Sequence, residues 1–301
     1  DVDPRDPPPG CRYVNAGEKP YDDVDLSRSL TVSSDVYYYR IGESIYTRTD
    51  HRDTAIQEAA GAYGLGLETG ITLPFEQNGY LPTPANRRQR NELNPIAFPE
   101  WGWSTGDNVI TAIGQGEVLV TPLQLANAFA TFANGGIRLS PNVVSRVVER
   151  DGSVVRQFGP RVLSEVAIDP GFRWRVLEGL SGVTADQEGT AYQAFNSLAT
   201  GGAYFPLETY PVAGKTGTAE VRGKADTSLF AAFGPVLEPT FAIVAILEEA
   251  GFGSSVAAPL VARIMEKVVE RTVPEAPQAS VRYARSVALP LCLEWYEWRS
   301  G

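Results

Sequence analysis

Hydrophobic and polar positions in the first half of the chain predict mainly helices and loops. Apolar residues at helical spacing predict a helix from Leu26 to about residue 45, with Asp25 as its cap, and a second helix over about 54–63. A Thr-Pro-Leu-Gln start at 121–124 predicts a third, which ends at two glycines. Residues 74–108, between these helices, are expected to be rich in loops.

The second half mixes strand-like runs with further helices. Valine-rich runs around Asp151-Gly152 predict a hairpin, because that dipeptide suits a tight turn. Three strand-like runs joined by short turns predict an antiparallel meander rather than parallel βαβ units: 212–221, 228–235 and 240–249. Helices are expected from Asp169 to about 180, after Gly189, and over 255–269. The predicted fold class is therefore α/β of the α+β type, an antiparallel sheet flanked by helices.

Composition removes several classes of function. A net charge of −10 over 301 residues argues against a nucleic-acid-binding protein, which needs a basic face. Cys11 and Cys292 belong to no Cys/His cluster, so we expect no metal site, and whether they pair is left open. His51, the one histidine, lies in a polar segment typical of a solvated surface. No apolar run approaches the roughly 18 residues of a membrane span.

The run "VAGKTGTAEV" at 212–221 places one of four lysines in a predicted strand. A glycine inside a strand weakens it and often allows another group to approach the backbone closely. An acyl substrate along this edge would meet main-chain N–H groups, while Lys215 and the hydroxyls of Thr216 and Thr218 would attract a carboxylate. The alternative is an ordinary edge strand with an exposed lysine.

A second polar run, Ser33-Ser34-Asp35, interrupts the first predicted helix. Serine and aspartate are poor residues for a helix interior, because their side chains compete for backbone hydrogen bonds. The run therefore indicates a local break in the helix, a functional display of a hydroxyl and a carboxylate, or a tolerated polar face.

The two runs together resemble signatures of the penicillin-binding protein and serine β-lactamase superfamily, namely S-x-N or S-x-D and then K-T-G. The chain more closely resembles the transpeptidase domain of an elongation-type class B penicillin-binding protein. The resemblance extends over about residues 10–270 in the family's order, and includes "GDNVITAIGQGEVLVTPLQLANAFATFANGG" and "FAAFGP". A β-lactamase fits less well, since nothing corresponds clearly to a deacylating base.

The resemblance implies roles for particular residues. Ser33 would relay protons, Asp35 would stand where an Asn is often found, and Lys215 would supply positive potential. Thr216, Gly217 and Thr218 would form the substrate-binding strand, with the N–H of Thr218 as half of an oxyanion hole. It also implies peptidoglycan stem peptides ending in D-Ala-D-Ala and β-lactams as ligands, and no cofactor. The full-length protein would be anchored at the extracytoplasmic face of the membrane, with a membrane glycosyltransferase as partner.

The family's nucleophile motif, S-x-x-K, is absent from the printed sequence. The residues three positions before the four lysines are Ala16, Val212, Val221 and Ile264. We expect an N-terminally truncated transpeptidase domain at 25–271, after an irregular segment at 1–24 and before a tail of unknown role at 272–301. This chain alone is expected to be inactive. The alternatives are a non-catalytic module that binds muropeptides or partners, and an unrelated protein with coincidental motifs.

Overall fold

The computed structural model describes residues 13–48, 54–196 and 205–272. Cys11, His51, Cys292 and almost all of the C-terminal tail lie outside the described residues, so the expectations about them stay predictions. Within the described part of the chain, none of the helices combines the length and apolarity that a membrane span requires.

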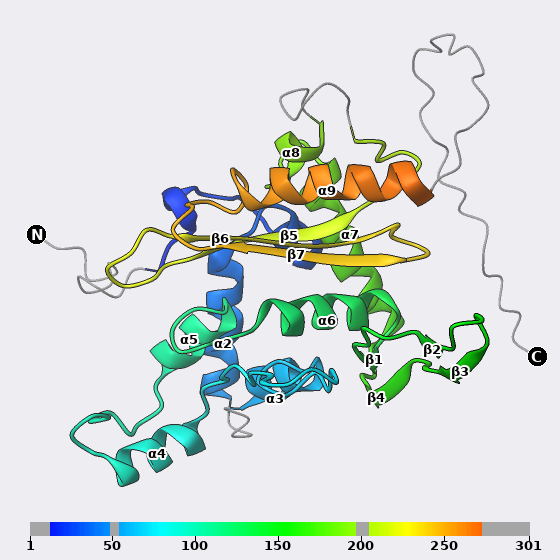
Figure 1. Cartoon of the computed structure of the whole chain (residues 1–301). Coiled ribbons are helices and arrows are strands. Elements are labelled where there is room, and N and C mark those ends of the chain that lie inside the picture. Colours follow the sequence, from blue (N-terminus) through cyan, green and yellow to red (C-terminus); the bar gives the residue numbers. More distant parts are fainter. Residues whose placement is uncertain (1–12, 49–53, 197–204, 273–301) are drawn as a thin grey trace, which may run out of the picture.

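The centre of the molecule is a three-stranded antiparallel sheet with strand order β5-β6-β7. Its strands are β5 (Ala213–Ala219), β6 (Thr227–Gly234) and β7 (Phe241–Leu247), so the predicted meander is confirmed. Figure 1 shows α9 (Ala257–Thr272) across one face of the sheet and α6 (Pro122–Ala133) across the other. Helices lie on both sides of an antiparallel sheet, as the predicted fold class requires.

The remaining helices lie around this centre. They are the short 3-10 helix η1 (Ala16–Glu18), α1 (Leu26–Thr31), α2 (Asp35–Thr47), α3 (Ala55–Ala62), α4 (Pro84–Leu93), α5 (Thr105–Ala112), α7 (Pro170–Ala185) and α8 (Tyr192–Asn196). Helix α7 packs against α1 and β5, and α2 packs against α5. Through α7, the N-terminal helix α1 lies on the β5 side of the sheet.

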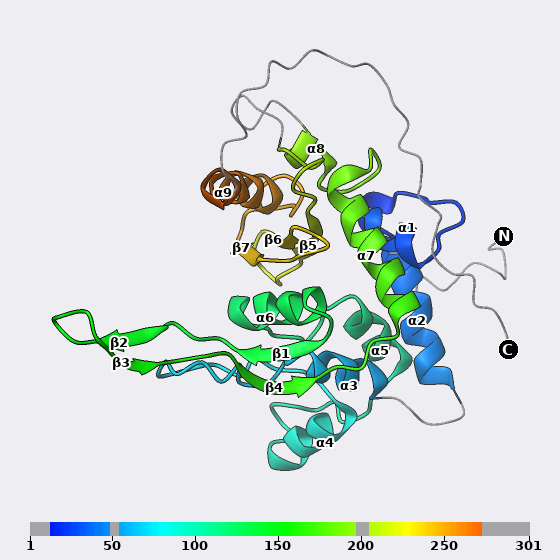
Figure 2. The ribbon, with the colours of Figure 1, turned by 90° about the vertical axis from the view of Figure 1, so that its right-hand side faces the viewer.

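Two further pairs of strands lie away from the central sheet. Strands β2 (Arg146–Val148) and β3 (Val154–Gln157) form the hairpin predicted at Asp151-Gly152, which projects from the body in Figure 2. Strands β1 (Ile137–Ser140) and β4 (Arg161–Glu165) pair at its base. Strands β1 and β4 were not predicted from the sequence. Both are short, and their antiparallel pairing contains a register shift between Arg138 and Leu139.

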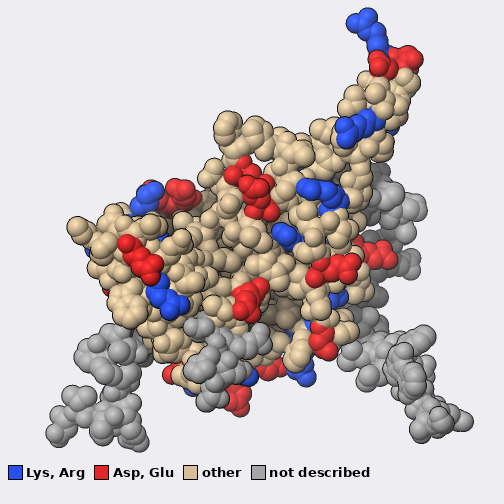
Figure 3. Space-filling view, turned by 90° about the horizontal axis from the view of Figure 1, so that it is seen from below, with Lys and Arg blue, Asp and Glu red and all other residues tan. Residues whose placement is uncertain are grey.

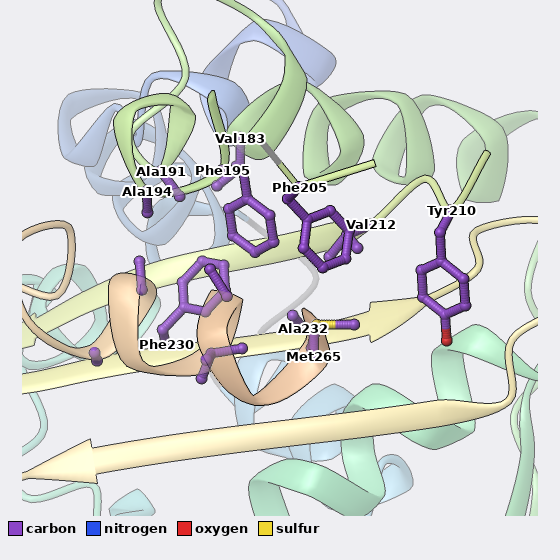
Figure 4. Close-up of a cluster of buried hydrophobic side chains, with 14 of the residues drawn as sticks. Val183, Ala191, Ala194, Phe195, Phe205, Tyr210, Val212, Phe230, Ala232 and Met265 are labelled. Carbon is purple, nitrogen blue, oxygen red and sulfur yellow. The ribbon is translucent and has the colours of Figure 1, made fainter. Parts of the chain in front are cut away.

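The core lies on both faces of the sheet because alternate residues of β6 point to opposite sides. Phe230 packs with Phe195, Phe205 and Met265 on the α9 face, as Figure 4 shows. Phe233 belongs to a second cluster, on the α6 and α7 side. Phe230 and Phe233 are both fully buried, so the central strand β6 contributes a phenylalanine to each of the two cores.

One predicted helix was wrong. The helix expected from Leu26 to about residue 45 is two helices, because the chain breaks at Val32–Ser34. Residues 74–108 lie mostly outside helices, as expected, but they also contain α4 and the start of α5. Each of these helices begins at a capping box, with Thr83 and Ser104 as the capping residues. In addition, α7 continues to Ala185 rather than ending near 180.

On the face shown in Figure 3, acidic and basic side chains are interspersed among other residues rather than gathered into a single-sign patch.

Candidate functional site

The break between α1 and α2 presents the hydroxyl of Ser33. Ser33 has a φ of 58°, in the left-handed region that non-glycine residues seldom adopt. The backbone N–H of Ser34 donates to the carbonyl of Ser29 at 2.9 Å, and the Tyr21 hydroxyl donates to the carbonyl of Val32 at 2.9 Å. These bonds fix the turn on both sides of Ser33. Of the three interpretations of the Ser-Ser-Asp run, the local break is confirmed.

Lys215 lies directly opposite this turn, on β5. Its Nζ donates to Ser33 Oγ at 2.6 Å and to the carbonyl oxygen of Thr216 at 3.0 Å. The contact joins residues 182 positions apart in the sequence. Burial lowers the pKa of Lys215 to about 8, although the nearby Asp35 carboxylate opposes the shift. The lysine can therefore exchange a proton near neutral pH while touching the serine hydroxyl.

Asp35 is the first residue of α2 and lies on the same side of the site. Its carboxylate accepts a hydrogen bond from the backbone N–H of Ala16 at 3.2 Å. Burial raises the pKa of Asp35, while the Ala16 bond and the charge of Lys215 act in the opposite direction. Asp35 thus acts electrostatically on the lysine and holds the segment before α1 against the site.

The threonines continue the polar edge of β5. Thr216 Oγ1 lies 2.7 Å from Thr190 Oγ1. Thr218 Oγ1 accepts from the backbone N–H of Gly253 at 3.3 Å, and the Thr218 carbonyl accepts from Gln115 Nε2 at 3.4 Å. Sequence reasoning missed Thr190 and Gln115. The one signal for Gln115 was its position between two glycines just after a helix.

Glycines allow close packing at this end of the sheet. A Cβ atom on Gly253 would lie 2.3 Å from the carbonyl oxygens of both Gly217 and Leu229, which is too close for any other residue. A Cβ atom on Gly217 would lie 3.2 Å from Leu229 Cβ, a tight contact. The segment after β7 can therefore lie directly against β5, and Gly217 lies between the two threonines, as predicted.

Comparison with known proteins shows the family to which the chain belongs. The family model described as the penicillin binding protein transpeptidase domain matches residues 8–266. The chain belongs to this family. The class B resemblance inferred from the ordered motifs is confirmed, as is the fold class.

Curated members of the family are similar to most of this chain. Peptidoglycan D,D-transpeptidase MrdA of Escherichia coli K12 is 29% identical over 285 residues, which are 87% of this chain and 40% of that protein. The Haemophilus influenzae protein of the same name is 27% identical over 276 residues, 86% of this chain and 38% of its own length. The chain thus spans about two-fifths of the length of these relatives.

Solved penicillin-binding proteins share the fold. Pseudomonas aeruginosa PBP2, solved in complex with WCK 5153, has a TM-score of 0.63 and 28% sequence identity, covering 82% of this chain and 47% of that one. PBP2 of Helicobacter pylori, solved in complex with MreC, has a TM-score of 0.63 and 24% identity, covering 85% and 42%. The second comparison supports the fold alone.

Proposed function

We propose that this chain is the transpeptidase domain of a PBP2-type peptidoglycan D,D-transpeptidase, and that the edge of β5 binds stem peptides ending in D-Ala-D-Ala, and β-lactams. The observation that carries the proposal is the 2.6 Å contact between Lys215 Nζ and Ser33 Oγ. It brings two distant family motifs into one site, beside two threonine hydroxyls on an accessible strand edge.

Each group has a distinct proposed task. The Lys215 ammonium and the hydroxyls of Thr216 and Thr218 attract the terminal carboxylate of the peptide. The Thr218 N–H donates to the oxyanion that develops on the carbonyl under attack. Ser33 passes a proton between Lys215 and the reaction centre, because its hydroxyl can donate and accept at once. Asp35 tunes the charge of the lysine by its proximity.

The chemistry of acyl transfer also needs an activated nucleophile. Members of this family use the serine and lysine of S-x-x-K, and the printed sequence contains no such motif. We therefore expect this chain to bind its ligands reversibly and to form no acyl-enzyme.

The setting of the whole protein belongs to the same proposal. The relatives named MrdA are peptidoglycan transpeptidases, and one structural neighbour is described as a peptidoglycan synthase complex that coordinates polymerization and crosslinking. These names support a membrane glycosyltransferase as partner and a location on the extracytoplasmic face of the membrane, where peptidoglycan is cross-linked.

Binding can be tested by titrating the ¹⁵N-labelled chain with N-acetyl-D-Ala-D-Ala and with its L,L stereoisomer, following backbone NMR signals. We expect saturable shifts with the D,D ligand at residues of β5 and the 31–35 turn, and weaker ones with the L,L ligand. A fluorescent penicillin should leave no covalent label after denaturation. Equal binding of both stereoisomers, or shifts confined to other surfaces, would contradict the proposal.

A further inference from the structure

The outward-facing backbone groups of β5 can be identified from their partners. The carbonyls of Thr216 and Thr218 accept hydrogen bonds from Lys215 and Gln115, and the carbonyl of Val212, just before β5, accepts from Thr184. None of these donors lies on β6. In an antiparallel ladder, the N–H and C=O of one residue point the same way, and successive residues alternate. The N–H groups of Thr216 and Thr218 therefore also point away from β6, toward any ligand on this edge.

Gln115 is held firmly where it meets this edge. Gly114 and Gly116 adopt φ values of 75° and 77°, which turn the chain sharply just after α5. The Gln115 N–H donates to the carbonyl of Ile110 at 3.2 Å, so the turn is part of the helix end. Helix α5 is in turn tied to α2, because Asn108 Nδ2 donates to the carbonyl of Gly42 at 2.8 Å. The half-buried Gln115 amide is thus fixed near Thr218.

The register of a bound peptide follows from the proposed function, on which this inference rests. If the Thr218 N–H binds the carbonyl of the penultimate D-Ala, the two residues face each other as a hydrogen-bonded pair. Such a pair exchanges both of its bonds, so the Thr218 carbonyl must accept from the N–H of the same D-Ala. That carbonyl is the group to which Gln115 Nε2 donates in the free protein, at 3.4 Å.

We propose that Gln115 is a specificity-determining residue that takes the place of the peptide N–H on the Thr218 carbonyl and must be displaced when a peptide binds. Its amide satisfies a carbonyl that would otherwise lack a donor, which keeps the free edge ordered. A ligand with a well-placed N–H replaces this bond with its own. A ligand without that N–H leaves the Gln115 bond in place, so Gln115 competes only with ligands that carry an amide at this position.

The test combines two proteins with two ligands. Wild type and Gln115→Ala are titrated by NMR with N-acetyl-D-Ala-D-Ala and with O-acetyl-D-lactoyl-D-alanine, in which an ester oxygen replaces the penultimate N–H. We expect Gln115→Ala to bind the amide ligand about 2- to 10-fold more tightly, since one competing hydrogen bond is gone. Affinity for the ester ligand should stay the same or fall, because that ligand offers the carbonyl no donor.

Controls separate this inference from the proposed function. Gln115→Leu should behave as Gln115→Ala does, and Gln89→Ala, at an exposed glutamine of α4, should leave both affinities unchanged. Stereoselective binding by wild type with no change in Gln115→Ala, or with equal changes for both ligands, overturns the role of Gln115 alone. Failure of every protein to bind either ligand overturns the proposed function and this inference together.

Discussion

The two edges of the central sheet differ in chemistry although they belong to the same three strands. On the β5 edge, the side chains of Thr184, Lys215 and Gln115 donate hydrogen bonds to the outward-facing carbonyls. Polar side chains also line this strand. The opposite edge is β7, "FAIVAIL", which has no polar side chain. Among the residues described by the structure, β7 pairs only with β6.

The register shows which groups β7 presents. Because Thr216 and Thr218 face outward, their partners on β6, Phe230 and Ser228, direct their backbone groups to β7. The outward N–H groups of β7 therefore belong to Ala242, Val244 and Ile246. Such a row on an apolar strand is a template for pairing with another strand, whereas the β5 edge is guarded by its own side chains. An edge that stays open for a ligand can therefore be protected by side chains that the ligand displaces.

The largest expected effect concerns the ion pair between Arg87 and Asp107, which anchors α5. Helix α5 in turn places Gln115 at the β5 edge. Arg87 is buried and its guanidinium lies 2.7 Å from the Asp107 carboxylate, while it also stacks on the ring of Trp103. Arg87→Met should lower the free energy of unfolding by about 2–4 kcal/mol, because it leaves Asp107 without its buried partner. Urea denaturation measures the loss.

The matched control for this anchor is the double variant Arg87→Met/Asp107→Asn, in which the amide oxygen can still accept the Ser104 hydrogen bonds of the capping box. It should recover most of the stability, since no uncompensated charge remains. If the comparison of edges holds, NMR signals of β5 near Thr218 shift in Arg87→Met more than those of β7. Similar shifts at both edges would show that α5 does not order the β5 edge in particular.

The next effect tests the β7 edge. Val244→Pro removes one outward N–H without removing a bond to β6, as proline is tolerated where the N–H faces away from the sheet. We expect concentration-dependent self-association, measured by analytical ultracentrifugation, to weaken by roughly an order of magnitude. Binding of D-Ala-D-Ala ligands should be unchanged. Ile243→Pro is the contrasting variant, because its N–H faces β6 and its loss should unfold the sheet. Undiminished association in Val244→Pro would assign self-association to another surface.

Sequence patterns predicted the sheet well because each strand's signal is local. The three strand-like runs and their short turns were sufficient for the β5-β6-β7 meander, and the Thr121 capping box located α6. The roles given to Ser33 and Lys215 came only from the family order of two motifs, and the structure brings the two side chains together. No local signal connects residues so far apart.

What the sequence did not reveal depends on tertiary contacts. Helix α4 is strongly polar, so its hydrophobic periodicity is weak, and its capping box at Thr83 was the remaining signal. Gln115 and Thr190 act only through the strand that they meet in space. The strained φ of Ser33 has no residue-type signal, because serine seldom adopts it.

A smaller effect is expected when the lysine of the β5 edge loses its charge. Lys215→Met should weaken binding of N-acetyl-D-Ala-D-Ala by about 10-fold, since a charged hydrogen bond to the ligand carboxylate is lost. Lys224→Met is the matched control. Lys224 is exposed and makes surface ion pairs with Glu248 and Glu249, which contribute little to stability. The affinity of Lys224→Met for the ligand should therefore stay within about twofold of wild type. Equal losses in both variants would mean that only general positive charge attracts the ligand.

The smallest effect is the pH dependence of the same site. The pKa of Lys215 is lowered to about 8 by burial, so between pH 7 and 9.5 the ammonium gives way to the amine while the ligand carboxylate stays ionised. Affinity should therefore fall a few-fold as pH rises through about 8.

Folding stability should change in the opposite direction. The folded lysine has a pKa below its ordinary value of 10.5, so the unfolded chain holds the extra proton and stability rises with pH between about 8 and 10.5. Lys215→Met should lose both slopes, and a variant that kept either one would show that another group titrates there.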